Sequence, residues 1–160
     1  MTTPLHIVFV CTGNICRSPM GEIILKKAVA DAGLDTKVRI TSCGTGGWHV
    51  GDGADYRAVN ELARAGYDGS QHRATQLGDE HRDADLLVAL DQGHYRALMR
   101  QGYEKDRVKL LRSFDPSAGD DLEVKDPYYG TEKDFATTRI QIEAAVDGML
   151  DWINHQLGTK

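Results

Sequence analysis

Short apolar runs alternate along the chain with longer segments in which apolar residues recur at helical spacing. Four runs rich in Val, Ile and Leu predict β-strands, at 5–10, 37–42, 85–90 and 108–112. The amphipathic segments between them predict helices, at 20–32, 54–65 and 92–101. Gly33 and Gly66 follow the first two of these segments and are expected to end them. A final helix is predicted from an apolar stripe that faces the core: Phe135, Ile142, Val146, Met149, Ile153 and Leu157.

This alternation of strands and helices predicts an α/β fold. We expect a single-domain three-layer sandwich over residues 1–160, with a four-stranded parallel sheet flanked by helices. In the predicted strand 85–90 every residue after Asp85 is apolar, which is typical of a strand covered on both faces. Ligands of such sheets bind beyond the carboxyl ends of the strands, where the long loops 44–54 and 113–130 are expected to lie. Four residues end or follow the predicted strands at this edge: Cys11, Ser42, Asp91 and Ser113.

The composition is that of an ordinary globular domain with an acidic balance. Apolar residues make up 41% and charged residues 27% of the 160 positions, and the formal net charge is −5. This charge argues against a general nucleic-acid or membrane-surface binder, so any attraction for an anionic substrate must be local to its pocket. Three cysteines, an odd and small number, suit a reducing compartment better than a disulfide scaffold. The first apolar run is too short for a signal peptide or a membrane span, so we expect a cytoplasmic protein without membrane insertion, with signal-less export left open.

The densest chemistry lies in residues 8–19, Val-Phe-Val-Cys-Thr-Gly-Asn-Ile-Cys-Arg-Ser-Pro, between the first strand and the first helix. Arg17 offers a planar, permanently charged fork that matches two phosphate oxygens. Converging loop amides, and the positive end of a helix that begins near Pro19, would add to an anion site. The same features favour a thiolate over a thiol at Cys11, to which Ser18 could donate a hydrogen bond. A buried structural cysteine beside a surface arginine is the alternative, and the strand–loop–helix context makes it the poorer one.

The segment 11–19 closely resembles the signature of the low-molecular-weight protein tyrosine phosphatases. Asp126-Pro-Tyr-Tyr129 matches a second motif of that family, and chain length and motif order agree over essentially the whole sequence. Val10 precedes the cysteine, whereas classical and dual-specificity tyrosine phosphatases usually carry histidine there. The resemblance therefore implies a bacterial member of the low-molecular-weight branch, a metal-independent hydrolase whose substrates are phosphotyrosine-containing proteins.

The resemblance also implies a division of chemical roles. The Cys11 thiolate would attack phosphorus and form a phosphocysteine intermediate, while Arg17 and the loop amides hold the other oxygens. Asp126 would protonate the departing phenolate and then deprotonate the water that releases phosphate. Pro127 biases Asp126 toward an extended backbone, although an Asp-Pro pair elsewhere is more often a plain turn. The remaining residues of the phosphate-binding loop are Thr12, Gly13, Asn14, Ile15, Cys16 and Ser18.

Asn14 is expected to adopt a positive φ, because a loop that points successive amides inward needs such a residue and asparagine tolerates it. In the family a polar network holds the matching asparagine, and the residues that correspond to this network here are Ser18, Ser42 and His72. Taken alone, a histidine in a polar loop would more often be solvated, so His72 is assigned a supporting role and not that of a catalytic base. Neither a metal nor another cofactor is expected, because the remaining histidines lack metal-ligand spacing: His6, His49, His81, His94 and His155.

Aromatic residues of the two long loops are the candidate walls of the substrate pocket. Trp48, Tyr128 and Tyr129 would form a deep slot around a phosphophenyl ring, with ordinary core aromatics as the alternative. By resemblance, Ile15 accompanies phosphotyrosine preference, whereas threonine there accompanies phosphoarginine preference. Trp48 resembles the broader branch of the family more than the enzymes dedicated to tyrosine autokinases. Some relatives are phosphorylated at matching tyrosines, so a tyrosine kinase acting on Tyr128 or Tyr129 is a second candidate partner.

Cys16 lies five residues after Cys11 in the same tight loop. Many family members use such a pair for a reversible disulfide that protects the nucleophile, so the resemblance implies a redox partner; a small apolar loop filler is the alternative. Cys43 is expected to be an inert, partly buried thiol. His49 either modulates the rim of the pocket or is a solvent-facing loop histidine.

Three rival functions compete with the phosphatase. A thioredoxin-coupled arsenate reductase would need further cysteines downstream, and none follows Cys43. A catalytically dead phosphotyrosine-binding module would be expected to lack Cys11, Arg17 or Asp126, and all three are present. A zinc site at Cys11 and Cys16 would lack a second pair of ligands.

Overall fold

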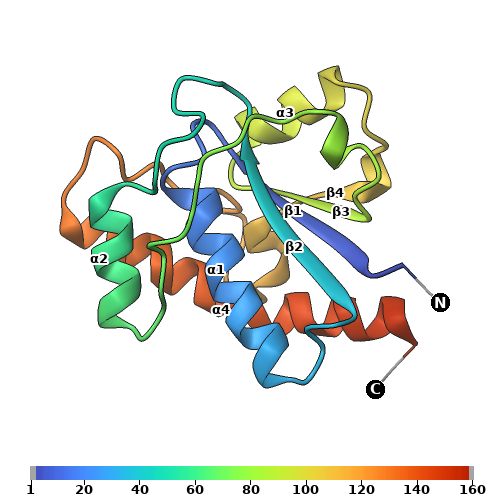
Figure 1. Cartoon of the computed structure of the whole chain (residues 1–160). Helices are drawn as coiled ribbons and strands as arrows, with labels where there is room; N and C mark the ends of the chain where they lie inside the picture. Colours follow the sequence, from blue (N-terminus) through green and yellow to red (C-terminus); the bar gives the residue numbers. More distant parts are fainter. Residues whose placement is uncertain (1–2, 159–160) are drawn as a thin grey trace.

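Strand β1 (Leu5–Cys11) lies inside a parallel sheet of four strands in the computed structural model, which describes residues 3–158. The strand order is β2-β1-β3-β4, so β1 pairs with β2 on one side and with β3 on the other (Figure 1). The other strands are β2 (Val38–Gly44), β3 (Leu86–Ala89) and β4 (Val108–Leu110). The predicted parallel sheet is therefore confirmed, with each strand close to its expected range.

Side chains of β1 alternate between two apolar layers. The helices are α1 (Arg17–Asp31), α2 (Tyr56–Arg64), α3 (Gln92–Arg100) and α4 (Glu132–Leu157). Ile7 and Phe9 are fully buried on the face covered by α1 and α4, whereas Val8 and Val10 are buried on the face covered by α3 (Figure 1). The three-layer α/β sandwich is thus confirmed; the expected domain, 1–160, includes two residues at each end that lie outside the described range.

Helix α1 begins at Arg17, three residues before the predicted start at Met20. The apolar period misses this first turn because Arg17 and Ser18 are polar, yet both side chains are buried. Gly33 and Gly66, with φ of 74° and 91°, follow α1 and α2 and end them as predicted.

The carboxyl end of β4 departs from the prediction of a strand over 108–112. The strand stops at Leu110, and Leu111–Phe114 form a short 3-10 helix that contacts α4. The Ser113 hydroxyl donates to the Leu110 carbonyl at 2.6 Å and closes this turn, so Ser113 belongs to the turn and not to the strand. Along α4 the predicted stripe is confirmed: Phe135, Ile142, Met149 and Ile153 are fully buried, and Val146 and Leu157 are half-buried at its margins.

The sheet topology defines one crevice at the carboxyl edge. The chain leaves β1 toward α1 on one face and leaves the neighbouring β3 toward α3 on the opposite face (Figure 1). Ligand sites of open α/β sheets lie at such a point, where successive connections diverge. Cys11 ends β1 and Asp91 follows β3, so the topology places both residues at the crevice.

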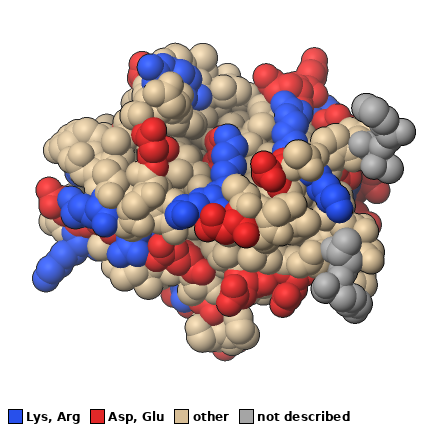
Figure 2. Space-filling model, turned by 60° about the horizontal axis from the view of Figure 1, so that its bottom comes forward, with Lys and Arg blue, Asp and Glu red and all other residues tan. Residues whose placement is uncertain are grey.

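No uniform charge covers the face on which α1 and α4 lie. Figure 2 shows Lys and Arg side chains scattered among Asp and Glu side chains over this face. Within residues 3–158, no helix combines the length and apolar character needed to span a membrane.

Candidate active site

Residues 11–17 form a tight loop between β1 and α1 whose carbonyl groups point away from its centre. The N–H groups of Thr45, Gly46 and Asp55 donate to the carbonyls of Cys11, Thr12 and Ile15, at 2.8, 2.9 and 2.8 Å. The C=O and N–H groups of a trans peptide point in opposite directions, so the N–H groups of residues 12, 13 and 16 face inward. Gly44 permits the close approach of β2, since a Cβ there would lie 2.7 Å from the Thr12 carbonyl oxygen. The loop therefore has the geometry of an anion-binding nest.

Asn14 holds the shape of this loop. Its φ is 59°, and it is the one non-glycine residue with a positive φ in the described part of the chain. Its side-chain Nδ2 donates to the hydroxyls of Ser18 (2.8 Å) and Ser42 (2.9 Å), and its Oδ1 accepts from the Thr75 N–H (2.8 Å). All polar atoms of this fully buried side chain are therefore paired, which offsets the cost of the left-handed backbone.

His72 and Glu22 extend the network around Asn14. His72 Nε2 lies 2.7 Å from the Asn14 carbonyl, which only accepts, so Nε2 carries the proton. The Ser42 hydroxyl donates to Glu22 Oε1 at 2.5 Å. The structure thus brings together the predicted supporting residues and adds Glu22, which the sequence analysis did not single out.

The three cysteines have different surroundings. Cys11 Sγ lies 2.9 Å from the Ser18 hydroxyl, at the amino-terminal end of α1, and it lines an open cavity. Burial raises the pKa of the Cys16 thiol, and the nearby negative charge of Asp55 adds to the effect. Burial likewise raises the pKa of Cys43, which is fully buried and not partly buried as expected. Cys16 and Cys43 are therefore held as neutral thiols, which leaves Cys11 as the candidate nucleophile.

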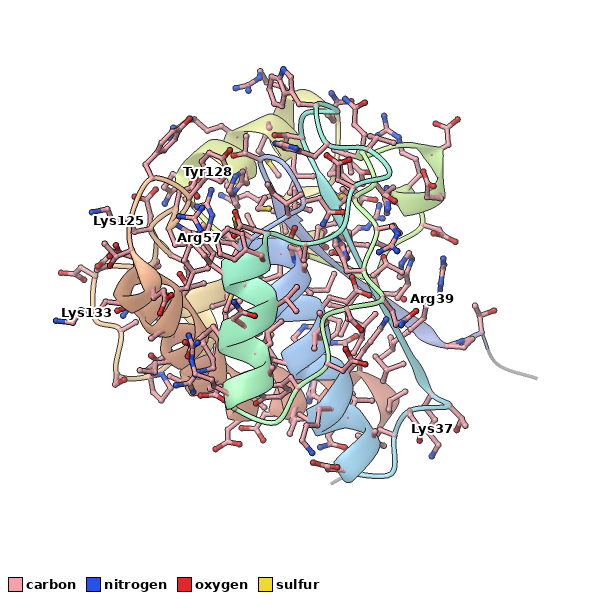
Figure 3. All side chains as sticks on the ribbon, turned by 60° about the vertical axis from the view of Figure 1, so that its left-hand side comes forward. Lys37, Arg39, Arg57, Lys125, Tyr128 and Lys133 are labelled. Carbon is pink, nitrogen blue, oxygen red and sulfur yellow. The ribbon has the colours of Figure 1, made fainter. Side chains whose placement is uncertain are left out.

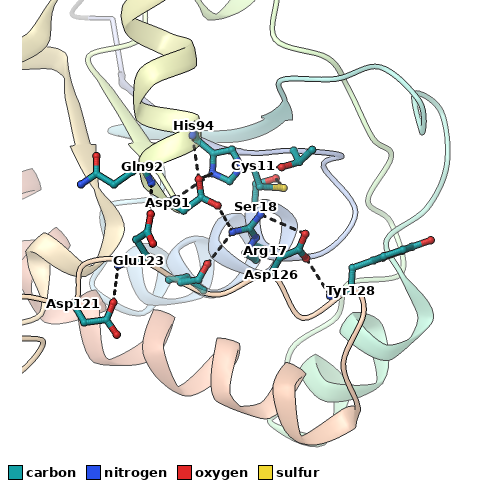
Figure 4. A network of polar contacts seen from close by, with 12 residues as sticks. Cys11, Arg17, Ser18, Asp91, Gln92, His94, Asp121, Glu123, Asp126 and Tyr128 are labelled. Carbon is teal, nitrogen blue, oxygen red and sulfur yellow. Dashed lines mark hydrogen bonds and ion pairs between the residues drawn. The ribbon is translucent and has the colours of Figure 1, made fainter.

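Arg17 is buried and oriented by groups from distant segments (Figure 4). Its Nη1 donates to Asp91 Oδ2 and to the Val124 carbonyl, both at 2.8 Å. Its Nη2 lies 3.7 Å from Asp126 Oδ2, the carboxylate predicted to be the general acid. These contacts occupy Nη1 and leave the N–H groups of Nε and Nη2 for an anion beside Cys11.

Asp91 contacts the candidate site, and the sequence analysis placed it at the correct edge of the sheet but left it without a role. Its Oδ1 accepts from the His94 N–H at 3.1 Å and caps α3, while its Oδ2 accepts from Arg17. Burial opposes ionisation of Asp91, but the hydrogen bond and positive charge of Arg17 and the hydrogen bond from the His94 N–H outweigh it and lower the pKa. The sequence signal that could have identified Asp91 was its position directly after a buried strand.

His94 links α3 to the phosphate-binding loop (Figure 4). Its Nδ1 accepts from the Asp91 N–H at 3.2 Å, so its Nε2 carries the proton and donates to the Thr12 hydroxyl at 3.0 Å. Burial, together with the positive charge of Arg17, lowers the pKa of His94 to about 4. The neutral imidazole is therefore the form that joins these two elements.

The His94 pKa predicts a loss of stability in mild acid. The unfolded chain takes up a proton at this residue below about pH 6.5, whereas the folded protein resists protonation down to about pH 4. The free energy of unfolding should fall by about 2 kcal/mol between pH 7 and pH 5 from this residue, because the unfolded state binds more protons there. Burial also lowers the pKa values of His6, His72 and His81, which adds to the effect. Urea unfolding at the two pH values measures the slope, and His94→Gln should reduce it; an unchanged slope in the variant would contradict the assignment.

The candidate catalytic groups line one open cavity of about 340 Å³. Its floor is the phosphate-binding loop, and its walls include His49 and Asp126. The predicted aromatics lie at its mouth: Trp48, Tyr128 and Tyr129 are 77%, 38% and 91% exposed. These exposures exclude the core-aromatic alternative and make the three residues a rim rather than the walls of a deep slot.

Two details fix the cavity rim. The rings of Tyr128 and Tyr129 meet edge to face with centroids 4.9 Å apart. His49 lines the cavity, where its ring packs close to Gly13, and its Nδ1 lies 3.3 Å from Asp52. His49 is therefore a rim residue. Within the described residues, no group of three or more His, Cys, Asp or Glu side chains is arranged to hold a metal ion.

Comparison with known proteins identifies the family to which this fold and loop belong. Residues 6–159 match the family model of the low molecular weight phosphotyrosine protein phosphatases, and the chain belongs to this family. The family makes the chain a phosphatase, a hydrolase, as the signature at 11–19 predicted.

Relatives of known name support the assignment over nearly the full length. The low molecular weight protein-tyrosine phosphatase A of Mycobacterium tuberculosis is 52% identical over 98% of this chain and 96% of its own length. The low molecular weight protein-tyrosine-phosphatase of Streptomyces coelicolor is 49% identical over 95% of both chains. A crystal structure of a protein tyrosine phosphatase from Entamoeba histolytica superposes with a TM-score of 0.87 at 30% identity, covering 96% of this chain and 98% of that one.

Proposed function

We propose that this protein hydrolyses phosphotyrosine monoesters in proteins through a phosphocysteine intermediate. The observation that carries the proposal is the single cavity lined by Cys11, Arg17 and Asp126, over a loop whose amides point inward. The family supports the reaction class, and the relatives named above are protein tyrosine phosphatases.

In the first step the Cys11 thiolate attacks phosphorus in line with the leaving phenolate. The S–P bond forms as the P–O bond to the tyrosine breaks, and Asp126 gives its proton to the phenolate oxygen. Arg17 and the inward amides hold the non-bridging oxygens, whose charge they stabilise through the transition state. The Ser18 hydroxyl, 2.9 Å from Cys11 Sγ, donates to the sulfur when it is a thiolate and again when it leaves.

In the second step the roles of thiolate and carboxylate reverse. Asp126, now ionised, takes a proton from a water that attacks phosphorus on the side vacated by the phenol. The S–P bond breaks, inorganic phosphate leaves, and Cys11 returns as a thiolate. The partial exposure of the Asp126 side chain, 43%, is compatible with this contact with water.

The aromatic rim supports selection of phosphotyrosine over phosphoserine. A phenyl ring can reach between Trp48 and Tyr128 while its phosphate contacts the loop. Ile15 lines the same cavity and offers an apolar surface to the ring. A phosphoserine side chain is too short to use both the rim and the loop.

Hydrolysis of a panel of phosphopeptides in the presence of EDTA tests the proposal. Phosphotyrosine peptides should be turned over at an undiminished rate with the chelator, and matched phosphoserine peptides should not. Absence of turnover on every peptide would remove the enzymatic function, and preference for phosphoserine would remove the specificity.

A reversible Cys11–Cys16 disulfide is the proposed response to oxidation. Hydrogen peroxide oxidises the Cys11 thiolate to a sulfenic acid with loss of hydroxide, and the Cys16 sulfur then displaces the hydroxyl group as water to form the disulfide. A thiol reductant restores both cysteines. Cys11 and Cys16 lie in one tight loop and are both buried, which supports a disulfide between them.

After peroxide treatment, wild-type protein should regain most of its activity with dithiothreitol. Cys16→Ser should regain far less, because the unprotected Cys11 proceeds to sulfinic acid. Mass spectrometry of the treated proteins distinguishes the disulfide from the sulfinic acid. Recovery of the variant to the wild-type level would rule out the protective role.

A cytoplasmic location and a kinase partner complete the proposal. A catalytic thiolate is best preserved in a reducing compartment. Tyr129, at 91% exposed, is accessible to a tyrosine kinase, and a phosphate there would lie at the mouth of the cavity.

A further inference from the structure

Arg57 lies outside the phosphate-binding loop but contacts the segment that carries Asp126. It belongs to the first turn of α2, and its guanidinium reaches across to the loop after Pro127 (Figure 3). Its Nη2 donates to the Tyr128 carbonyl at 2.9 Å, and its Nη1 lies 3.3 Å from the Gly130 carbonyl. One side chain thus holds two carbonyls of this loop.

Asp55 fixes the orientation of the Arg57 side chain. Its Oδ1 accepts from Arg57 Nε at 3.0 Å and its Oδ2 from Arg57 Nη2 at 2.9 Å, which is a bidentate pair. Both side chains are largely buried. The guanidinium also lies over the buried Phe135 ring, 4.7 Å from its centroid, at the start of α4. The Arg57 side chain is therefore held in one orientation and is not a solvated surface charge.

Asp55 and Arg57 together connect the phosphate-binding loop to the segment that carries Asp126. On one side the Asp55 N–H donates to the Ile15 carbonyl of the phosphate-binding loop at 2.8 Å. On the other side the Tyr128 N–H donates to Asp126 Oδ1 at 3.0 Å, so the residue whose carbonyl Arg57 holds also orients the carboxylate. Hydrogen bonds through Asp55, Arg57 and Tyr128 therefore link the phosphate-binding loop to Asp126.

We propose that Arg57 is a positioning residue that sets the distance between Asp126 and the phosphate-binding loop. This inference rests on the proposed function, because it assigns Asp126 the role of general acid. A misplacement of about 1 Å in a catalytic group can cost up to ~10²-fold in rate. The loss should fall on the steps that need the proton and spare phosphate binding.

The test uses leaving groups that differ in their need for a proton. The phenol of phosphotyrosine has a pKa of about 10 and needs an acid, whereas the more acidic 4-nitrophenol leaves more easily without one. Arg57→Met should lower kcat/KM at least ~10-fold on a phosphotyrosine peptide, and distinctly less on 4-nitrophenyl phosphate. In Arg57→Met/Asp126→Asn the Arg57 effect should disappear, because the group it positions is already gone.

Two variants control for folding and charge. The Asp55 cap of α2 survives in Arg57→Met, because it accepts the backbone N–H of residue 57. Arg57→Lys keeps the charge and should restore part of the peptide activity. Arg64→Met removes an exposed arginine from the other end of the same helix, where it pairs with Glu61. This variant should keep the wild-type kcat/KM on both substrates.

Hydrogen exchange tests whether Arg57 holds this loop in place, and it needs no substrate. Amides of residues 126 and 128–131 should exchange faster in Arg57→Met, while those of β1 and β3 should not change. Equal losses on the two substrates, additive effects in the double variant, or unchanged exchange in 126–131 would each overturn the assignment of Arg57. Wild-type protein that hydrolyses neither substrate would instead overturn the proposed function, whatever the exchange data show.

Discussion

Replacing Cys11 by serine is expected to abolish hydrolysis of phosphotyrosine peptides, with a loss in kcat on the order of 10⁵ or more. A serine hydroxyl is hardly ionised at neutral pH, so the nucleophile disappears even though its position is kept. The neighbouring Ser18 hydroxyl and the helix end can stabilise a thiolate but cannot create an alkoxide. Steady-state kinetics with a phosphotyrosine peptide measures the loss.

Binding and folding should survive this change. Arg17 and the inward amides remain, so inorganic phosphate should bind Cys11→Ser about as well as wild type in isothermal titration. Cys43→Ala is the matched control, because it removes a buried thiol that does not line the cavity. A Cys11→Ser variant that keeps a tenth of the wild-type kcat, or a Cys43→Ala variant that loses activity while still folded, would contradict the assignment of the nucleophile.

Local sequence signals predicted the phosphate-binding loop because its chemistry is contiguous. The candidate nucleophile Cys11, Arg17 and Asn14 with its positive φ lie within seven positions, and the strand before them and the helix after them follow from periodicity. The supporting contacts of Asn14 come from Ser42 and His72, far away in sequence, and these were identified only through the resemblance.

Contacts that depend on tertiary packing were not predictable in the same way. Asp91 and Arg57 look like ordinary helix-cap and surface residues in the sequence, and their roles appear only when β3 and α2 are placed beside the loop. The exposure of Trp48 and Tyr129 depends on how far their loops extend from the sheet edge, which periodicity does not encode. The sequence therefore singled out the candidate reacting groups more readily than the residues that contact and orient them.

These orienting contacts couple the two charged groups of the site. Arg17 is shared between Asp91, which holds it at 2.8 Å, and Asp126, which lies 3.7 Å away. A dianionic phosphate beside Cys11 would compete with Asp126 for the same guanidinium.

Asp126→Asn is expected to lower kcat/KM for phosphotyrosine peptides by ~10²–10⁴-fold. The amide keeps the shape of the carboxyl and can still accept the Tyr128 N–H through Oδ1, so the loop should stay in place. It cannot donate a proton to the phenolate or take one from water, so both steps slow. With 4-nitrophenyl phosphate, whose leaving group needs little assistance, the first step should outrun the second, and a burst of nitrophenol should precede slow turnover.

Rapid quenching should then trap phosphate on Cys11, detected as an added phosphoryl group by mass spectrometry. Asp120→Asn changes an exposed acid of the same long loop and should behave as wild type on both substrates. An Asp126→Asn variant with unchanged kcat would exclude Asp126 as acid and base. A slow variant without a burst or a trapped phosphocysteine would contradict the predicted slow second step, because formation of the intermediate would then still limit the rate.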